Sequence, residues 1–360
     1  MNVVPDVSAD RETTASPAAA RSLGAYTTLR LGGPADTLTV VTEAGEAVAA
    51  VRAATAAGQP VFVLAGGSNV VVGDGGFAGT VVLLRTSGMR VVSRDSTAAV
   101  VRVAAGEPWD DVVARTVAEG LSGLECLSGI PGSAGATPIQ NVGAYGQEVG
   151  HTIVAVHAYD RTTDEVRAYT PAECGFGYRS SIFKHTDRWV VLEVDFRLAV
   201  SGESAPVRYA ELARRLGVEV GERVPLEQAR DTVLKLRAGK GMVLDAEDRD
   251  TWSVGSFFTN PVLSAAQWAA LRERADPPCW PGEQGAVKVP AAWLIEQAGF
   301  PKGYGRDEVA ISTKHTLALT NRGGGTTAAL LELAREIRDG VRTRFGVELH
   351  PEPVLVNCAL

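Results

Sequence analysis

The sequence lacks the features of membrane-embedded, secreted and disulfide-rich proteins. No apolar run approaches the roughly 18 residues that a membrane helix requires, and the N-terminus does not show the basic and then apolar order of a secretion signal. The four cysteines have no C-x-x-C spacing, so neither a disulfide framework nor a zinc site is indicated. We therefore expect a cytoplasmic protein without membrane partners, in which Cys126, Cys174, Cys279 and Cys358 are free thiols.

Positive charge and clustered metal ligands are also scarce. A net charge of −7 argues against general nucleic-acid binding, although a few local Arg and Lys residues could still hold a small anionic ligand. The five histidines are dispersed and no carboxylates cluster at ligand spacing, so no metal site is predicted. With 360 residues, of which 45% are hydrophobic and 21% charged, the chain can form two or three compact globular units.

Glycine is plentiful, and one glycine segment, residues 61–69, reads VFVLAGGSN. An apolar strand here runs into two glycines, a serine and an asparagine. The backbone N–H groups of Gly66, Gly67 and Ser68 can converge on an anion, and the side chains of Ser68 and Asn69 add donors. The segment is neither the G-x-G-x-x-G dinucleotide motif nor a P-loop. It predicts a phosphate-binding turn of another kind.

A second glycine segment, residues 129–146, reads GIPGSAGATPIQNVGAYG and contains no charged side chain. Glycines and small neighbours allow the backbone to approach a ligand closely, which suits a large, flat or anionic molecule. A solvent-exposed loop is the alternative. Solvent loops seldom carry Ile130, Ile139, Val142 and Tyr145 at such spacing, so a ligand-lining loop is favoured.

The chain divides into three units after a tail, residues 1–20, that is predicted to be flexible. The first unit alternates strand and helix, and the second adds strands with period-2 patterning, as an α+β fold does. The predicted strands cover residues 36–42, 61–64, 80–84, 99–106, 153–158 and 189–198, and the predicted helices cover residues 43–57 and 109–119.

The third unit follows a charged stretch, residues 238–252, that is predicted to be a linker or mobile segment. Its most regular element is a long helix that Thr326 and Thr327 can cap and that ends at Phe345 and Gly346. The buried face of this helix is predicted to consist of Leu330, Leu333, Ala334, Ile337 and Val341. The tail VELHPEPVLV, residues 347–356, is predicted to be a final strand.

Three short segments carry residues suited to chemistry. Arg179 stands in GYRSSIFK among aromatic and small residues, where a structural cation–π contact is the alternative. Ser256 stands in GSFFTNP, where two phenylalanines can seat its hydroxyl in an apolar pocket, or where it can act as a turn residue. Glu352 lies between two prolines that stiffen the chain, although a Glu near a C-terminus is usually a solvated charge.

Together with the two glycine segments, these motifs resemble the UDP-N-acetylenolpyruvoylglucosamine reductase family. The resemblance runs from about Tyr26 to Val356 and includes TTLRLGGPAD, LAGGSNVVVGDGGFAGTVV, FGYRSSIFK, GSFFTNP, AAWLIEQAGFPKG and HPEPVLV. It implies an α+β fold in which a two-part FAD-binding region of the vanillyl-alcohol-oxidase/PCMH type precedes a C-terminal α/β substrate-binding domain. The implied boundaries are 21–85 with the returning strand 347–360, then 86–238, then 239–346.

The resemblance also implies a reaction. NADPH as co-substrate reduces a non-covalent FAD, and UDP-N-acetylglucosamine enolpyruvate then takes the hydride to give UDP-N-acetylmuramate for peptidoglycan synthesis. Arg179 and Glu352 fall on family positions that polarise the enolpyruvyl carboxylate, where a fixed guanidinium stabilises developing negative charge. Ser256 falls on the position of the proton donor, which must lie close to the receiving carbon.

Further contacts follow from the same resemblance. The implied cofactor-binding residues are Gly66, Gly67, Ser68, Asn69, Ser133, Ala134, Gly135, Thr137, Gln140, Asn141, Gly143 and Ala144. The implied substrate-binding residues are Tyr145, Tyr209, Lys240, Asn260, Lys302 and His315, with Tyr209 on the closing loop of a longer subtype. The chain departs from the family pattern in the middle of AGGSN, where many members carry an acidic residue, and in the linker GMVLDAEDRDTW.

Two other functions compete with this prediction. An oxygen-using sugar or alcohol oxidase on the same flavin fold often tethers its flavin through His or Cys, and Cys126 is the candidate here. A non-catalytic flavin or nucleotide sensor is the other alternative, since a fold alone does not fix function. The sequence gives neither the acyl group of the hexosamine nor the preference for NADPH over NADH, and a monomer is the default expectation.

Overall fold

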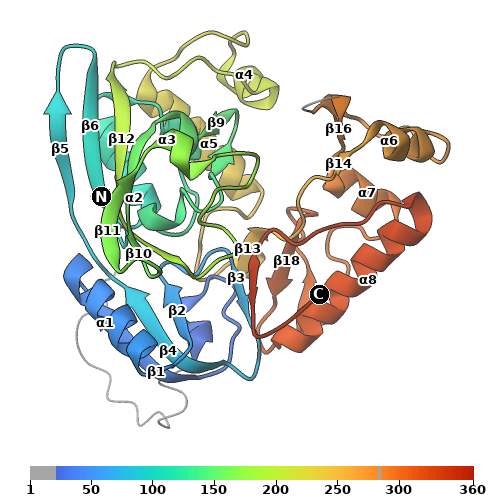
Figure 1. The fold of residues 1–360 in the computed structure, drawn as a ribbon. Coiled ribbons are helices and arrows are strands. Elements are labelled where there is room, and N and C mark those ends of the chain that lie inside the picture. Colours follow the sequence, from blue (N-terminus) through green and yellow to red (C-terminus); the bar gives the residue numbers. More distant parts are fainter. Residues whose placement is uncertain (1–21, 283–284) are drawn as a thin grey trace.

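A computed structural model describes residues 22–282 and 285–360, and the predicted tail, residues 1–20, lies outside the described residues. Figure 1 shows a blue N-terminal unit below a green and yellow unit, with an orange and red unit beside them. Among the described residues, no helix is both long and apolar enough to cross a bilayer.

The first unit is a small parallel sheet covered by one helix. Its strands have the order β1-β4-β2, and the short 3-10 helix η2 (Leu23–Tyr26) precedes them. A reciprocal capping box between Glu43 and Glu46 starts the helix α1, and Ala47 and Val51 of that helix are buried. The elements are β1 (Ala35–Val41), α1 (Ala44–Ala56), β2 (Val61–Leu64) and β4 (Phe77–Leu84).

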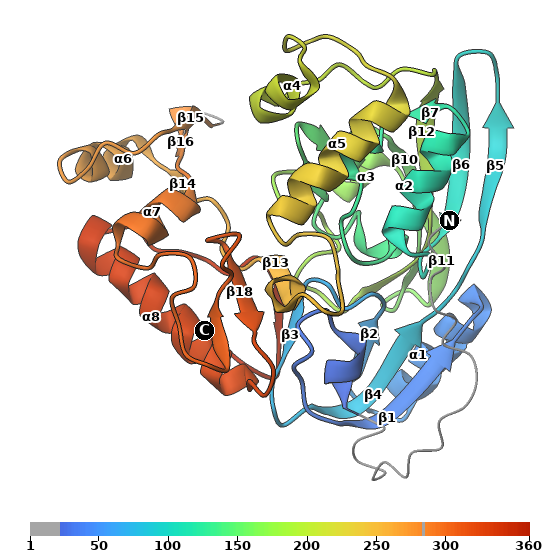
Figure 2. The same cartoon turned by 180° about the vertical axis from the view of Figure 1, so that it is seen from behind.

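The second unit is built on a sheet of order β11-β10-β12-β6-β5, with β7 paired to β12. Trp109 packs its ring 5.7 Å from that of Phe196 in the core. Figure 2 shows α5 beside α2 on the back of this sheet, with α4 on the far side of α5. The strands are β5 (Met89–Arg94), β6 (Ala98–Ala104), β7 (Leu121–Ser122), β8 (Gly143–Ala144), β9 (Gln147–Glu148), β10 (Ile153–Asp160), β11 (Glu165–Tyr169) and β12 (Trp189–Val200). The helices are α2 (Trp109–Ala118), η3 (Glu125–Leu127), η4 (Ala134–Ala136), η5 (Val149–His151), α3 (Pro171–Cys174), α4 (Ala210–Leu216) and α5 (Leu226–Gly239).

Strand β12 shows the predicted alternation with one difference. Its even-numbered residues from Val190 to Leu198 are buried, which confirms the predicted core face. Asp195 on the other face is also buried, because it accepts two hydrogen bonds from Arg102 and lies 3.0 Å from the ring nitrogen of His157. A charge on the outer face of a sheet is thus paired rather than solvated.

The third unit holds two three-stranded antiparallel sheets and a long helix. The sheets have the orders β13-β18-β17 and β14-β16-β15. Helix α8 is capped by the hydroxyl of Thr326, ends at Gly346 with φ 71°, and buries the whole predicted apolar face. The strands are β13 (Ser253–Ser256), β14 (Val262–Leu263), β15 (Trp280–Pro281), β16 (Val287–Lys288), β17 (Val309–Ile311) and β18 (Ala318–Asn321), and the helices are η6 (Arg249–Thr251), α6 (Ala265–Arg272), α7 (Ala291–Gln297) and α8 (Thr327–Phe345).

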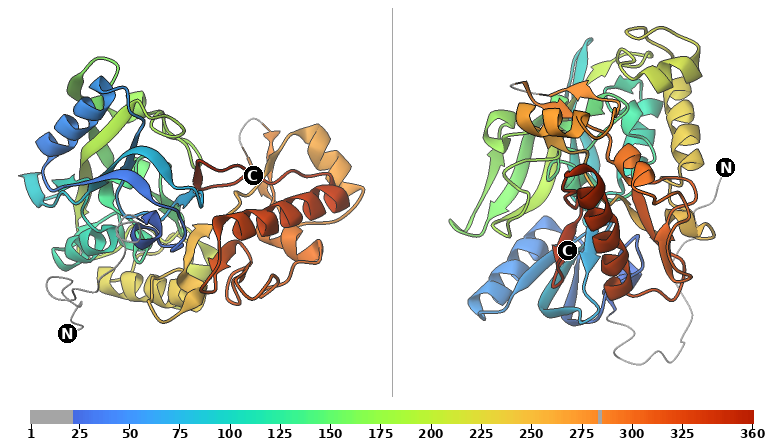
Figure 3. Two further views of the ribbon diagram at one scale, coloured as in Figure 1. Left: turned by 90° about the horizontal axis from the view of Figure 1, so that it is seen from below. Right: turned by 90° about the vertical axis from the view of Figure 1, so that its right-hand side faces the viewer.

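The C-terminal segment joins the third unit to the first. The prediction of one strand over residues 347–356 is wrong, since only β19 (Val354–Val356) is a strand, paired in parallel with β3 (Val70–Val72). Pro351 and Pro353 lack the N–H that a strand ladder needs, so the chain before Val354 bends. Figure 3 shows the dark red end of the chain reaching the blue unit.

Side chains reinforce the junction between the first and third units. The Thr28 hydroxyl donates to the carbonyl of Ser253 at 2.6 Å, and Asp74 accepts hydrogen bonds from the backbone N–H groups of Thr327 and Ala328. Asp74 thereby caps α8 from outside its own unit, with its negative charge at the positive end of the helix dipole. These hydrogen bonds fix the third unit to the first, next to the cavity that is described below.

Candidate active site

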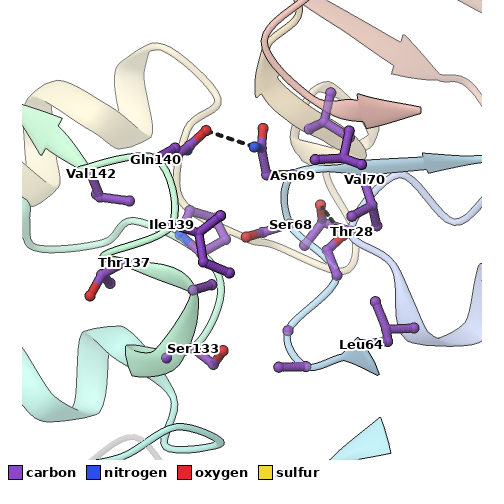
Figure 4. Close-up of a pocket in the computed structure, with 18 of the residues that line it drawn as sticks. Thr28, Leu64, Ser68, Asn69, Val70, Ser133, Thr137, Ile139, Gln140 and Val142 are labelled. Atoms are coloured by element: carbon purple, nitrogen blue, oxygen red, sulfur yellow. Dashed lines mark hydrogen bonds between the residues drawn. The ribbon is translucent and has the colours of Figure 1, made fainter. Parts of the chain in front are cut away.

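A cavity of about 640 Å³ lies where the three units meet. Both predicted glycine segments line it, as do residues from the stretch predicted to be a linker and residues flanking β19. Figure 4 shows Ser68 and Asn69 on one wall and Ser133, Thr137, Ile139 and Gln140 on the facing wall. The site is therefore assembled from segments that are far apart in the sequence.

The two glycine segments touch where they cross. A Cβ atom on Gly66 would lie 2.6 Å from the Cα atom of Gly132, and a Cβ atom on Gly67 would lie 2.0 Å from the carbonyl oxygen of Tyr26. Gly67 also has φ 59°, which disfavours other residues. Beyond the crossing, the Asn69 amide donates to Gln140 at 2.7 Å and holds the segments together.

Replacing Gly66 by Ala should therefore disrupt this crossing. We expect the variant to lose most of its capacity for the flavin that the resemblance implies, because the added methyl group must push the Gly132 backbone away from the predicted phosphate-binding turn. Flavin absorbance per mole of purified protein measures the effect. Gly75→Ala is the control, since its Cβ would meet nothing within 4 Å; equal flavin content in both variants would contradict the role given to the crossing.

The cavity contains polar atoms that lack partners. In the described part of the chain, four buried side-chain atoms have no hydrogen-bond partner: Ser133 Oγ, Arg161 Nε, Arg237 Nε and Trp252 Nε1. The first three residues line the cavity, and Trp252 lines a smaller adjoining hollow of about 370 Å³. Because buried polar groups are normally satisfied, these atoms point to a ligand. A long molecule with an anionic centre, such as a flavin dinucleotide, fits this arrangement.

Most of the predicted cofactor residues line the cavity: Gly66, Gly67, Ser68, Asn69, Ser133, Gly135, Thr137, Gln140 and Gly143. Ala134, Asn141 and Ala144 lie outside its lining. The Asn141 side chain is used within the protein, since it donates to Glu148 and to the carbonyl of Gly177 and accepts from the N–H of Gly150. Asn141 thus shapes the loop, and sequence alone does not separate this role from ligand contact.

Arg179 is held at the edge of the cavity by three contacts. Its Nη2 donates to the carbonyl of Gly143 at 2.8 Å, its Nε lies 3.2 Å from Glu352 Oε1, and its own carbonyl accepts from Lys184 Nζ. Its φ of 52° is in the left-handed region, a strained conformation that such contacts must maintain. The alternative cation–π contact also exists, with the guanidinium 5.4 Å from the Tyr178 ring. The guanidinium is therefore fixed in position.

Glu352 is not a solvated charge. Its side chain is 13% exposed and lines the cavity. Burial raises the pKa of Glu352, while the positive charges of Arg179 and Lys184 oppose that rise. The backbone on either side is fixed, because the N–H of Glu352 donates to the carbonyl of Phe257 and that of Val354 donates to the carbonyl of Asn69.

Ser256 ends strand β13 and lines the same cavity. The next two residues, Phe257 and Phe258, are fully buried with ring centroids 5.1 Å apart, so they anchor the strand end. The hydrogen bond from Glu352 to the Phe257 carbonyl places the serine and the glutamate on neighbouring backbone segments. Arg179, Ser256 and Glu352, from three separate motifs, thus meet at one cavity.

None of the six predicted substrate residues lines the cavity, and three of them, Tyr145, Tyr209 and Lys240, form a cluster. The rings of Tyr145 and Tyr209 meet edge to face with centroids 5.5 Å apart, and the Lys240 ammonium lies 5.8 Å from the Tyr145 ring. Lys240 also pairs with Glu211 of α4 at 2.8 Å. Tyr209, which is 44% exposed, directly precedes α4.

The remaining substrate candidates come from the third unit. Asn260 Oδ1 accepts a hydrogen bond from the N–H of Ala291, so this side chain caps α7 in the described conformation. Lys302 is exposed. Burial lowers the pKa of His315 to about 4, and the positive charges of Lys240, Lys302 and Arg237 act in the same direction. Together these cations make this side of the site electropositive.

The lowered pKa of His315 has a consequence for stability. The unfolded chain takes up the proton near pH 6.5 and the folded protein only near pH 4, so stability falls as pH drops between these values. We expect the wild type to lose about 3 kcal/mol more unfolding free energy than His315→Gln across this window. Urea unfolding at pH 7.5 and 4.5 measures it. Parallel losses in both proteins would contradict the burial of a neutral imidazole.

Sequence reasoning missed part of the site. The stretch predicted to be a linker supplies Gly241, Met242, Val243 and Leu244 to the cavity lining, and Arg237 of α5 lies beside them. The apolar MVL inside a charged stretch was the available signal. Cys126, the candidate for a covalent flavin, is buried and outside the cavity lining, and burial raises the pKa of its thiol, which disfavours the thiolate.

Comparisons with known proteins place these features in one family. The FAD binding domain family matches residues 35–168, and the family described as UDP-N-acetylenolpyruvoylglucosamine reductase, C-terminal domain, matches residues 247–356. The chain is 62% identical to a Salinispora arenicola protein named UDP-N-acetylenolpyruvoylglucosamine reductase, over 100% of both chains. It is 58% identical to the Streptomyces coelicolor protein of that name, over 94% of this chain and 90% of the relative.

A solved structure agrees with these relatives. The crystal structure of UDP-N-acetylenolpyruvylglucosamine reductase from Thermus caldophilus has a TM-score of 0.63 and 25% identity over 93% of this chain and 97% of its own. The predicted fold class, a flavin-binding region followed by a C-terminal domain, is confirmed by these matches.

Proposed function

The chain belongs to the UDP-N-acetylenolpyruvoylglucosamine reductase family and is an FAD-dependent oxidoreductase, and we propose how its cavity carries out the reaction. The substrate is UDP-N-acetylglucosamine enolpyruvate, NADPH is the reductant, and the product UDP-N-acetylmuramate enters peptidoglycan synthesis. The observation that carries the proposal is the meeting of Arg179, Ser256 and Glu352 at a cavity bounded by two glycine segments.

When bound, FAD would supply the redox chemistry, by which a hydride passes from NADPH to the enolpyruvyl double bond. The pyrophosphate would be held by the N–H groups of Gly66, Gly67 and Ser68, with the partnerless hydroxyl of Ser133 facing them across the cavity. Thr137 and Gln140 would continue along the dinucleotide on the second segment. A loop without charged side chains suits the flat, mainly apolar ring system.

Arg179 binds the enolpyruvyl carboxylate and stabilises the negative charge that develops beside it, since a fixed guanidinium needs no reorganisation. Glu352, whose raised pKa favours the protonated form relative to an ordinary carboxyl, shares this task by hydrogen bonding. Ser256 donates the proton to the carbon that carries the developing charge. The Arg179–Glu352 pair keeps both groups aimed at one position.

The finer assignments belong to the same proposal. We place the flavin-binding halves at residues 21–85 with 347–360 and at residues 86–238, and the substrate domain at residues 239–346. Tyr145, Tyr209 and Lys240 would approach the diphosphate of the sugar nucleotide when α4 moves toward the third unit. We further propose that the protein works as a cytoplasmic monomer.

Product analysis in deuterated water tests the function. The protein, NADPH and UDP-N-acetylglucosamine enolpyruvate should yield a product two hydrogens heavier than the substrate. In D2O the product should carry up to two carbon-bound deuteriums, because the N–H hydrogen of a reduced flavin and the hydroxyl proton of Ser256 both exchange with solvent. Oxygen consumption with peroxide release, and no reduced sugar nucleotide, would instead indicate the oxidase alternative. Flavin binding without any turnover would indicate a sensor.

A further inference from the structure

Arg237 in the last turn of α5 is a cation without an ion-pair partner among the described residues. Its Nη2 donates to the carbonyl of Met242 at 2.8 Å, but its Nε is sealed from solvent and has no hydrogen-bond partner among the described residues. Asp110 is the one carboxylate whose charge acts on it, and Asp110 is already bound by two nitrogens of Arg230. No ion pair to Arg237 occurs within residues 22–282 and 285–360.

Holding the Arg237 guanidinium without an opposite charge costs the folded protein free energy when no ligand is bound. Burial lowers the pKa of Arg237 to about 10, which shows that the folded state disfavours its charge. A neutral donor would serve equally well to hold the Met242 carbonyl. A cation whose Nε is sealed from solvent without a partner is stabilised when a ligand supplies the opposite charge.

The position of Arg237 indicates which ligand supplies this opposite charge. The residue lines the main cavity, and a Cβ atom on Gly129, the first residue of the second glycine segment, would lie 3.6 Å from Arg237 Nε. Arg237 is also close enough to His315 for its positive charge to lower the pKa of that histidine, as the charges of Lys240 and Lys302 do. It therefore lies between the flavin-binding segments and the cluster predicted to bind the sugar nucleotide.

We propose that Arg237 is a phosphate-binding residue that pairs with the diphosphate of a ligand in this cavity. The inference rests on the proposed function in that two of its ligands, FAD and the UDP-sugar, each carry a diphosphate. The guanidinium donates two parallel hydrogen bonds to phosphate oxygens, one of them from the Nε that now lacks a partner. Two sources of the diphosphate are open, the cofactor and the sugar nucleotide.

Binding measurements on the flavin-loaded protein test this proposal without turnover. Arg237→Gln and Arg237→Lys are compared with Lys235→Gln, which removes an exposed cation from the same helix. One arm follows the fluorescence of flavin released on dilution, and the other measures UDP binding to the loaded protein by calorimetry. We expect at least one affinity to fall about tenfold to a hundredfold in Arg237→Gln, with partial recovery in Arg237→Lys and no change in Lys235→Gln.

The two arms also identify the ligand. Weaker flavin retention alone assigns Arg237 to the cofactor, and weaker UDP binding alone assigns it to the nucleotide substrate. The thermal unfolding midpoint separates binding from scaffolding: removing an unpaired charge should not lower it when ligand is absent. Unchanged affinities in both arms, or losses that only accompany a lower midpoint of the flavin-free protein, would overturn the proposal. Neither readout requires the enolpyruvyl sugar to react, so failure of the proposed reaction would be seen separately.

Discussion

Replacing Ser256 by Ala should leave the reduction of bound FAD by NADPH at its wild-type rate and slow the step with UDP-N-acetylglucosamine enolpyruvate by about a hundredfold to ten-thousandfold. The hydroxyl has no role in accepting the hydride from NADPH, whereas it supplies the proton to the reacting carbon. Its place at the end of β13, above two buried phenylalanines, keeps the backbone unchanged when Oγ is removed. This single variant therefore distinguishes the reduction of FAD by NADPH from the later step with the sugar nucleotide.

Anaerobic stopped-flow absorbance at the flavin band measures both steps in sequence. Thr259→Ala is the matched control, because this hydroxyl lies three residues along the same segment, bonds weakly to His350 at 3.4 Å and is outside the cavity lining. Equal slowing of both steps in Ser256→Ala would reject the proton-donor assignment.

Replacing Arg179 by Met should also suppress the second step selectively, by about a hundredfold to a thousandfold. Loss of the guanidinium removes the charge that faces the enolpyruvyl carboxylate and leaves Glu352 buried without its ion-pair partner. Because Arg179 opposes the rise in the pKa of Glu352, the variant should titrate Glu352 at a higher pH. Arg179→Lys should recover little activity, since an ammonium cannot contact both Gly143 and Glu352 as the planar guanidinium does.

Single-turnover rates across pH 5 to 9 check this prediction. Arg167→Met serves as the control, because Arg167 is half exposed on β11 and outside the cavity lining. A wild-type pH profile in Arg179→Met, or a loss of the first step equal to that of the second, would contradict the role of Arg179.

Local sequence patterns predicted part of the secondary structure, and the resemblance supplied the candidate site residues. The period-2 pattern of β12 and the apolar face of α8 appear in the structure because each depends on residues a few positions apart. Arg179, Ser256 and Glu352 had weak individual signals. Their meeting depends on contacts that no local pattern encodes, such as the hydrogen bond from the Glu352 N–H to the Phe257 carbonyl.

Where the structure departs from the sequence predictions, the cause is again contact between distant segments of the chain. Asp195 is buried because it is bonded to Arg102 and His157 of neighbouring strands, and the stretch 241–244 lines the cavity together with residues of the first two units. The sequence analysis did not single out Arg237, and the fold places it on α5 at the cavity with no ion-pair partner among the described residues. The role of a charged residue depends on its contacts with distant segments, and a single sequence does not show those contacts.

The most direct test of the account is one anaerobic stopped-flow experiment on the purified wild-type protein. The account predicts that NADPH bleaches the flavin band and that UDP-N-acetylglucosamine enolpyruvate then restores it without oxygen. Restoration only after oxygen is admitted, or a protein that binds no flavin, would contradict the central claim.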